Sequence, residues 1–259
     1  MRRLILEEPY SRAAIWSRRL AAAAIVASLA AVGLARVDRF DSNLALTALW
    51  VGLFLAGAAL LLAAAGAVVI WRTGRRGVGL VLAAVLLAAA PLAFPLWLTA
   101  QAFRLPVLND ISTDLVDPPE FSRSAVALAA RGGHIPPFVD PKRREAQRAA
   151  YPATQPIIID LEVDEAHALL LKVVGALKWR LVEQRPPGGR FGFGHIDAID
   201  RTLVMGFRDD VTIRLRPLAG QSRIDIRSVS RLGRHDFGAN ARRIAAFAEE
   251  LQTQLDEGR

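Results

Sequence analysis

Two long stretches of this chain contain no charged side chain. Residues 44–71 and residues 77–103 lack Asp, Glu, Lys and Arg and are rich in Leu, Ala and Val. A helix rises about 1.5 Å per residue, so roughly 20 apolar residues cross the ~30 Å hydrocarbon core of a bilayer. Both stretches exceed that length. The sequence therefore predicts two membrane-spanning helices, at about residues 44–70 and 78–100.

A third apolar segment, Leu20–Ala35, is shorter, with 16 uncharged residues bounded by arginines on both sides. Because long basic side chains can reach the membrane interface while their stems stay in the hydrocarbon, we expect a first span at about residues 16–35. The alternative is a signal peptide, with Gly33-Leu34-Ala35 as a small-x-small cleavage site. The sequence leaves both interpretations open for this segment.

Arginines are distributed unevenly around these segments. The N-terminal 19 residues hold five arginines, loop 72–76 holds three, and loop 36–43 balances two arginines with two aspartates. Basic loops favour the cytoplasmic side. We therefore expect a cytoplasmic N-terminus in a bacterial inner (plasma) membrane, and a periplasmic or otherwise extracytoplasmic C-terminal domain. No span contains an ionisable residue, the usual mark of an ion or proton pathway, so the helices are predicted to be an anchor.

The net charge of +8 is also divided unevenly between the apolar first part of the chain and the rest. Residues 1–103 carry 10 arginines against 4 acidic residues, whereas residues 104–259 carry 23 basic against 21 acidic residues. The near-neutral balance of the second half argues against nucleic acid as a partner. The chain has no cysteine, which excludes thiol catalysis, disulfides and cysteine-ligated metal sites.

The second half has the pattern of a soluble α+β protein. Residues 104–152, rich in proline, are expected to form an extended arm with short helices at Phe121–Arg131 and after Asp140-Pro141. Residues 153–259 are expected to form an antiparallel sheet with two helices on one face, in the order β-α-β-β-β-β-α. Six segments are predicted to be strands, one more than this order contains: Ile157–Glu162, Trp179–Gln184, Arg190–Ile199, Thr202–Phe207, Val211–Pro217 and Arg223–Ser230.

The run SVSRLGRHDFGANARRI at residues 228–244 resembles the signature of an uncharacterised bacterial family, domain of unknown function 1499. Asn109–Asp114, Pro118-Pro119 and Tyr151-Pro152 resemble its earlier segments, so the similarity covers roughly residues 105–255. The resemblance implies an envelope or membrane-tethered setting and no particular activity. The candidate family-motif residues are Ser230, Arg231, Asp236, Asn240 and Arg243.

Arginines alternate with apolar residues along two predicted strands. Arg214 and Arg216 share one face of a strand, and Arg223 and Arg227, with Asp225 between them, share one face of the next. Period-two alternation places both sets on the face away from the core. This open cationic face is our candidate anion-binding site, because guanidinium groups bind phosphate and carboxylate well. The alternative is a solvated face with cross-strand Arg–Asp pairs.

The remaining polar residues form no recognisable catalytic or metal-binding motif. The four histidines (His134, His167, His195 and His235) are scattered, and the acidic residues of the arm lack the spacing of a calcium loop. We therefore expect no metal ion, no cofactor and no catalytic residues. An alternative is an envelope hydrolase that uses His235, Asp236 and nearby arginines, although a helix-capping role explains Asp236 more simply.

Together these patterns predict a membrane-anchored envelope domain that is not an enzyme. Its expected partners are the lipid bilayer and an anionic lipid, a glycan or an envelope protein.

Overall fold

The computed structural model describes residues 8–37, 42–136, 141–188 and 192–258. The chain divides into two compact units. The first comprises Met1–Ala100 with Val204–Gly206, and the second comprises Gln101–Leu203 with Phe207–Arg259. Asp140, the predicted cap of a helix in the arm, lies outside the described residues.

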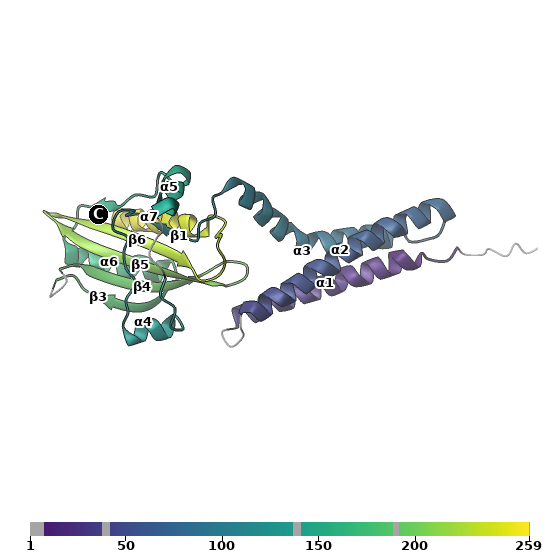
Figure 1. Ribbon diagram of the computed structural model, residues 1–259, viewed down its shortest axis with the longest axis horizontal. Coiled ribbons are helices and arrows are strands. Elements are labelled where there is room, and N and C mark those ends of the chain that lie inside the picture. Colours follow the sequence, from purple (N-terminus) through teal and green to yellow (C-terminus); the bar gives the residue numbers. More distant parts are fainter. Residues whose placement is uncertain (1–7, 38–41, 137–140, 189–191, 259) are drawn as a thin grey trace, which may run out of the picture. The chain divides into compact units, whose positions relative to one another are not determined.

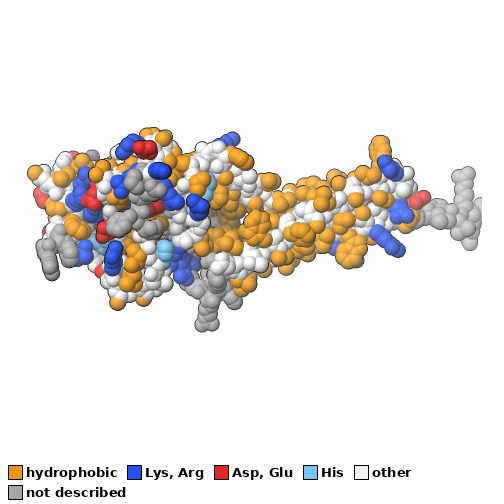
Figure 2. Space-filling model, viewed as in Figure 1, with side chains coloured by type: hydrophobic (Ala, Val, Ile, Leu, Met, Phe, Trp, Pro, Cys, Tyr) orange, Lys and Arg blue, Asp and Glu red, His pale blue; other side chains and the backbone are white. Residues whose placement is uncertain are grey.

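The first unit consists of three long apolar helices (Figure 1). They are α1 (Arg12–Arg36), α2 (Ser42–Thr73) and α3 (Val78–Arg104). Each is long and apolar enough to cross a membrane. Figure 2 shows that the surface of this unit is predominantly hydrophobic, with arginines gathered toward one end. The predicted helical anchor is therefore confirmed as three apolar helices of membrane-spanning length.

Small residues bring α1 and α2 into close contact. A Cβ atom added at Gly66 of α2 would lie 3.0 Å from the backbone nitrogen of Ala14 in α1, and one added at Gly52 would collide with the Ser28 side chain. The buried residues of α1 are likewise small: Ala14, Ser17, Ala21, Ala24 and Ala31. Small residues on both helices therefore allow α2 to pack closely on α1.

The second unit contains one antiparallel sheet, which confirms the predicted fold class. Its elements are β1 (Asp110–Ser112), α4 (Ala125–Ala130), α5 (Pro141–Ala150), β2 (Ile157–Ile159), α6 (Val163–Ala176), β3 (Arg180–Arg185), β4 (Gly194–Arg201), β5 (Arg208–Leu218), β6 (Gln221–Ser230) and α7 (Ala239–Glu257). The strand order is β1-β6-β5-β4-β3, and β2 pairs with β6 beside β1. From β2 onward the elements follow the predicted order β-α-β-β-β-β-α.

Helices α6 and α7 cover one face of this sheet (Figure 1). Their apolar residues share a core with the alternate residues of β4, β5 and β6. Phe247 of α7 is fully buried and stacks on Trp179 with ring centroids 5.8 Å apart. Ile244, Phe247 and Leu251 form the buried apolar face of α7.

One predicted strand is wrong. Thr202–Phe207 is the loop between β4 and β5, closed by a hydrogen bond from the Thr202 amide to the Phe207 carbonyl at 2.9 Å. Gly206 has a φ of +68°, which a regular strand does not allow. Asp209 and Asp210, which fall between two predicted strands, lie inside β5. The short apolar run Leu203–Met205 resembled a buried strand in the sequence.

The arm that precedes α4 covers the other face of the sheet. Strand β1 of the arm pairs with β6 and so adds to the sheet. The Gln147 side chain of α5 accepts a hydrogen bond from the Ser112 amide and donates one to the Ser112 carbonyl. The following residues contact side chains of β4, β5 and β6 that point away from α6 and α7. This face, predicted to be open, is therefore partly enclosed by the chain itself.

Candidate functional site

Three arginines and three aspartates meet beneath the arm. Arg214 of β5 lies 3.0 Å from Asp225 and 3.0 Å from Asp117. Arg223 of β6 lies 2.7 Å from Asp114 and 2.9 Å from Asp225. Arg216 pairs with Asp117. We call this set of six residues the arm cluster, and its formal charges balance.

Solvent reaches the arm cluster unevenly. The side chain of Asp225 is fully buried and that of Arg214 is 9 % exposed. The side chains of Arg216 and Arg223 are 33 % and 30 % exposed, and Asp117 is the most accessible member at 65 %. The cluster thus has a buried, structural half and an outer half where two guanidinium groups meet solvent beside one exposed carboxylate.

Arg227, the fourth arginine of the predicted ladder, lies apart from the arm cluster. It forms a two-point contact with Asp110 of the arm, at 2.9 Å and 2.7 Å, and its guanidinium lies over the ring of Phe121. Only 3 % of this residue is exposed. The prediction of four arginines on one open face is therefore wrong for Arg227, and also for Arg214, because aspartates of the arm cover and neutralise them.

A second buried ion pair links the arm to β4. Arg131 lies 2.8 Å from Asp197, and His195 lies 3.0 Å from the other oxygen of the same carboxylate. Burial raises the pKa of Asp197, but the interactions with His195, Arg131 and Thr212 outweigh it and hold this pKa below its ordinary value of 3.8. Neither Arg131 nor Asp197 was singled out from the sequence, since each lacks a local motif.

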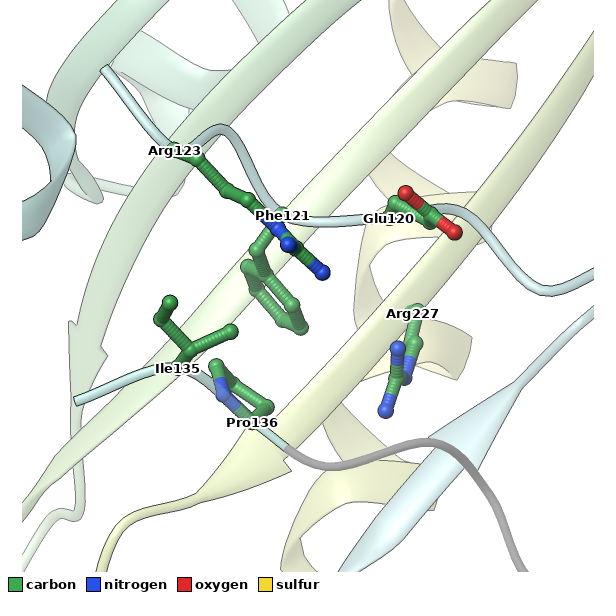
Figure 3. Close-up of a pocket in the computed structure, with 6 residues that line it drawn as sticks. All are labelled: Glu120, Phe121, Arg123, Ile135, Pro136 and Arg227. Atoms are coloured by element: carbon green, nitrogen blue, oxygen red, sulfur yellow. The ribbon is translucent and has the colours of Figure 1, made fainter.

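A small cavity opens beside Phe121 on this face (Figure 3). Phe121 and Arg123 reach it from the arm, and Arg227 reaches it from β6. Its volume is about 20 Å³, enough for about one water molecule. The cavity is too small for an organic ligand.

The family-motif residues form a polar network beneath α7. The Arg243 guanidinium lies 2.6 Å from both Asp200 and Asp209, and it also donates to Ser228 and Asn240. The side-chain amide of Asn240 donates in turn to the Ser230 hydroxyl at 3.0 Å. Burial raises the pKa of Asp209. Burial lowers the pKa of Arg243, but Asp209 and Asp200 together outweigh it, so this pKa is raised. Each of these polar groups has a partner inside the protein, so the network is a structural brace.

The other motif residues also have local partners. Arg231 lies on the opposite face of the sheet and binds Asp210 through two hydrogen bonds, at 2.9 Å and 2.7 Å. The Asp236 carboxylate accepts hydrogen bonds from the amides of Gly238 and Asn240, which caps α7. His235 accepts the Phe237 amide at Nδ1. His235 and Asp236 are therefore engaged with backbone, and the geometry gives no support to the hydrolase alternative.

A larger groove lies on the helical side of the domain. It has a volume of about 580 Å³, within the range of small-molecule sites, and lies among β2, α6 and the end of α7. Ile157, Leu169 and Leu255 contribute apolar surface, and Lys172 contributes a cation. Within the described ranges, no three His, Asp or Glu side chains lie together in a way that could hold a metal ion.

A family model described as "Protein of unknown function (DUF1499)" matches residues 110–251. The match begins at β1 and ends within α7, so it includes the arm, the whole sheet and the motif network, and it covers more than half of the chain. The resemblance inferred from the motifs is confirmed. No curated protein matches the chain.

Proposed function

The chain belongs to the DUF1499 family of proteins of unknown function, and from this premise we propose that its C-terminal domain is a non-enzymatic binding domain, tethered to a membrane, for a ligand that carries an anionic group. The observation that carries the proposal is the outer half of the arm cluster. Arg216 and Arg223 are both partly exposed, and the most accessible carboxylate of the cluster, that of Asp117, pairs with Arg216.

Asp117 is the member of the cluster that an external anion can replace. Its carboxylate contacts Arg214 and Arg216 and is 65 % exposed, so its interaction is largely screened by water. Asp114 and Asp225 are fixed more firmly, because each accepts hydrogen bonds from two arginines in a buried setting. An incoming phosphate or carboxylate group would take over the guanidinium contacts that Asp117 makes now.

We propose a ligand in solution rather than a lipid. Arg216 and Arg223 are paired across β5 and β6 close to the turn at Ala219-Gly220. The arm enters the sheet at the other end, where Asp110 pairs with Val229. The proposed partners are therefore anionic glycans or acidic segments of envelope proteins.

Binding of inorganic phosphate by the full chain in uncharged detergent micelles tests the proposal. We expect weak binding that falls as salt is added, because screening weakens interactions between partly exposed charges. Arg216→Gln should reduce the affinity by about tenfold, since a charge-assisted hydrogen bond contributes roughly 1.5 kcal/mol. Asp117→Asn should increase the affinity, because it removes the competing carboxylate. Isothermal titration calorimetry measures all three.

Lys172→Gln is the matched control, because it removes a cation from the large groove and leaves the arm cluster intact. Its affinity for phosphate should equal that of the parent chain. If Lys172→Gln abolishes binding while Arg216→Gln does not, the ligand site is the groove and the proposal is wrong. Absence of salt-sensitive binding in the parent chain would also refute it.

We further propose that this domain lies outside the cytoplasm. The support is the excess of arginines in the N-terminal segment and in residues 72–76, combined with three membrane-length helices. Alkaline phosphatase fused to the C-terminus should be active, and a fluorescent protein that matures only in the cytoplasm should be dark. An inactive phosphatase fusion together with a bright fluorescent fusion would reverse the orientation. Fusions to residues 72–76 should give the opposite pattern and serve as the control.

A further inference from the structure

One edge of the sheet is only half covered. Strands β1 and β2 both pair with β6 on this edge. Along β1, the Gln147 side chain of α5 occupies the outer side, because it bonds both the amide and the carbonyl of Ser112. Among the described residues, no group binds the outer side of Ile158 in β2 in this way. The β1 part of the edge is therefore closed by α5, and the β2 part is open.

The register shows which backbone groups of β2 face outward. Ser112 pairs with Arg227 of β6. Ile158 pairs with Arg223, an even number of residues away along the same strand. Backbone groups of an antiparallel strand face its two edges alternately. Since the Ser112 amide and carbonyl face away from β6, toward Gln147, those of Ile158 face away from β6 as well. The open edge thus presents one donor and one acceptor to a further strand.

The large groove on the helical side lies beside this open edge. Its apolar walls come from β2, α6 and α7 and include Ile157, Ile159, Leu169 and Leu255. Ile157 and Ile159 contact the core on the helical face, whereas Ile158 is 57 % exposed. In a strand added at this edge, the residue beside Ile158 would lie on the arm side of the sheet. Its two neighbours would point to the helical side and enter the groove, because side chains of a strand alternate.

On the arm side, a row of arginines leads to the same edge. Arg216 pairs with Arg223 across β5 and β6, and Arg223 pairs with Ile158. Adjacent strands are about 4.8 Å apart, so a residue beside Ile158 would lie about 10 Å from Arg223 between Cα atoms. Arg223 is 30 % exposed, and within the part of the chain that the structure describes its Nη1 makes no hydrogen bond. A glutamate beside Ile158 can reach this donor. Asp160, which follows β2 and binds Gln221, would repel an acidic side chain placed further along.

We infer that an extended acidic segment of a partner protein adds to β2 as a further strand. The inference rests on the proposed function, because it uses Arg223 as an anion-binding group and narrows the ligand to a protein segment. The backbone of Ile158 exchanges two hydrogen bonds with the segment. An acidic residue beside Ile158 binds the outer half of the arm cluster, and the apolar residues before and after it enter the groove. In such strand addition, the main chain provides affinity and the alternate side chains provide specificity.

A short peptide with one glutamate between two valines tests this inference on the full chain in uncharged detergent micelles. Isothermal titration calorimetry should show binding that weakens by about tenfold when glutamine replaces the glutamate, because a charge-assisted hydrogen bond is lost. Methylation of single peptide amides should weaken binding at alternate positions only, by about fivefold or more, because successive amides face opposite edges. Equal effects of methylation at the glutamate and at the next valine would overturn strand addition.

Ile158→Pro tests the same pairing from the side of the chain. It removes an amide that has no partner in the domain, so urea unfolding and phosphate binding should stay unchanged while affinity for the peptide falls by about tenfold or more. Ile158→Ala keeps the amide and should bind the peptide within about threefold of the parent chain. If Ile158→Pro fails to fold, the methylated peptides still decide. If it instead converts a dimer of the chain to a monomer, a second copy covers the edge and the inference is wrong.

Phosphate binding separates the failure of this inference from the failure of the proposed function. Binding of phosphate without binding of the peptide overturns strand addition and leaves the proposed function standing. Binding of the glutamate and glutamine peptides with equal affinity, without binding of phosphate, refutes the proposed function and the acidic partner together.

Discussion

Replacing Arg243 with alanine is expected to lower the free energy of unfolding of the C-terminal domain by about 3–5 kcal/mol, the usual effect of removing one partner from a buried ion pair. Arg243 separates Asp200 and Asp209, which are directly paired across β4 and β5. Without the guanidinium these two carboxylates face each other, and Asn240 loses a hydrogen-bond donor at 2.7 Å. Urea unfolding of the full chain in mild detergent measures the loss.

Trp179 is a suitable reporter for this measurement. It is 7 % exposed and stacks on Phe247 of α7, so its emission responds to separation of the helix from the sheet. The other four tryptophans lie in or near the apolar helices and are replaced by Phe: Trp16, Trp50, Trp71 and Trp97.

The neighbouring Arg242 provides the control for Arg243. It is exposed, and its side chain donates to the Phe237 carbonyl at 3.1 Å. Arg242→Ala should change the free energy of unfolding by no more than about 0.5–1 kcal/mol. Equal effects of the two substitutions would contradict the view that the motif network braces α7 against the sheet.

Replacing Arg227 with glutamine should also destabilise the domain strongly, by about 3–5 kcal/mol. The substitution leaves Asp110 buried without its two-point partner and removes the cation over Phe121. Asp110 is the first residue of β1, so the loss should loosen the pairing of β1 with β6. Urea unfolding followed by Trp179, together with proteolysis of the arm, measures both effects.

Arg216→Gln is the matched comparison, because both arginines were expected on one open face. Arg216 is 33 % exposed and its partner Asp117 is 65 % exposed, so the substitution should cost no more than about 1 kcal/mol. Arg216→Gln should weaken anion binding with little loss of stability. Arg227→Gln should lower stability strongly and leave anion binding by the folded domain nearly unchanged. A stable Arg227→Gln chain would show that the arm does not depend on this ion pair.

The sequence by itself determined the features that depend on neighbouring residues. Uncharged stretches longer than a bilayer is thick can form only membrane helices or a fully buried core, so α2 and α3 were predicted from composition alone. Alternation in β5 and β6 placed Ile213 and Ile226 toward the helices and Arg214 and Arg227 on the other face, because successive side chains of a strand point to opposite sides. The Asp236 cap was likewise evident from its position before α7.

Local patterns misled where an apolar loop imitated a strand. Residues 202–207 form a short apolar run, as a buried strand does, and only the closure of the loop between Thr202 and Phe207 showed the turn. The acidic residues of the arm matched no calcium-loop spacing in the sequence. In the structure Asp114 accepts two backbone amides of the arm and also pairs with arginines of two strands.

Only the tertiary structure decided which charges meet. Arg214 and Asp114 are 100 residues apart, and Arg227 and Asp110 are 117 residues apart. Neither separation leaves a trace in local periodicity, because an ion pair needs only proximity in space and charges of opposite sign. The sequence placed the arginines on the correct face of the sheet, and the path of the arm across that face determined which of them are buried and which two, Arg216 and Arg223, still meet solvent.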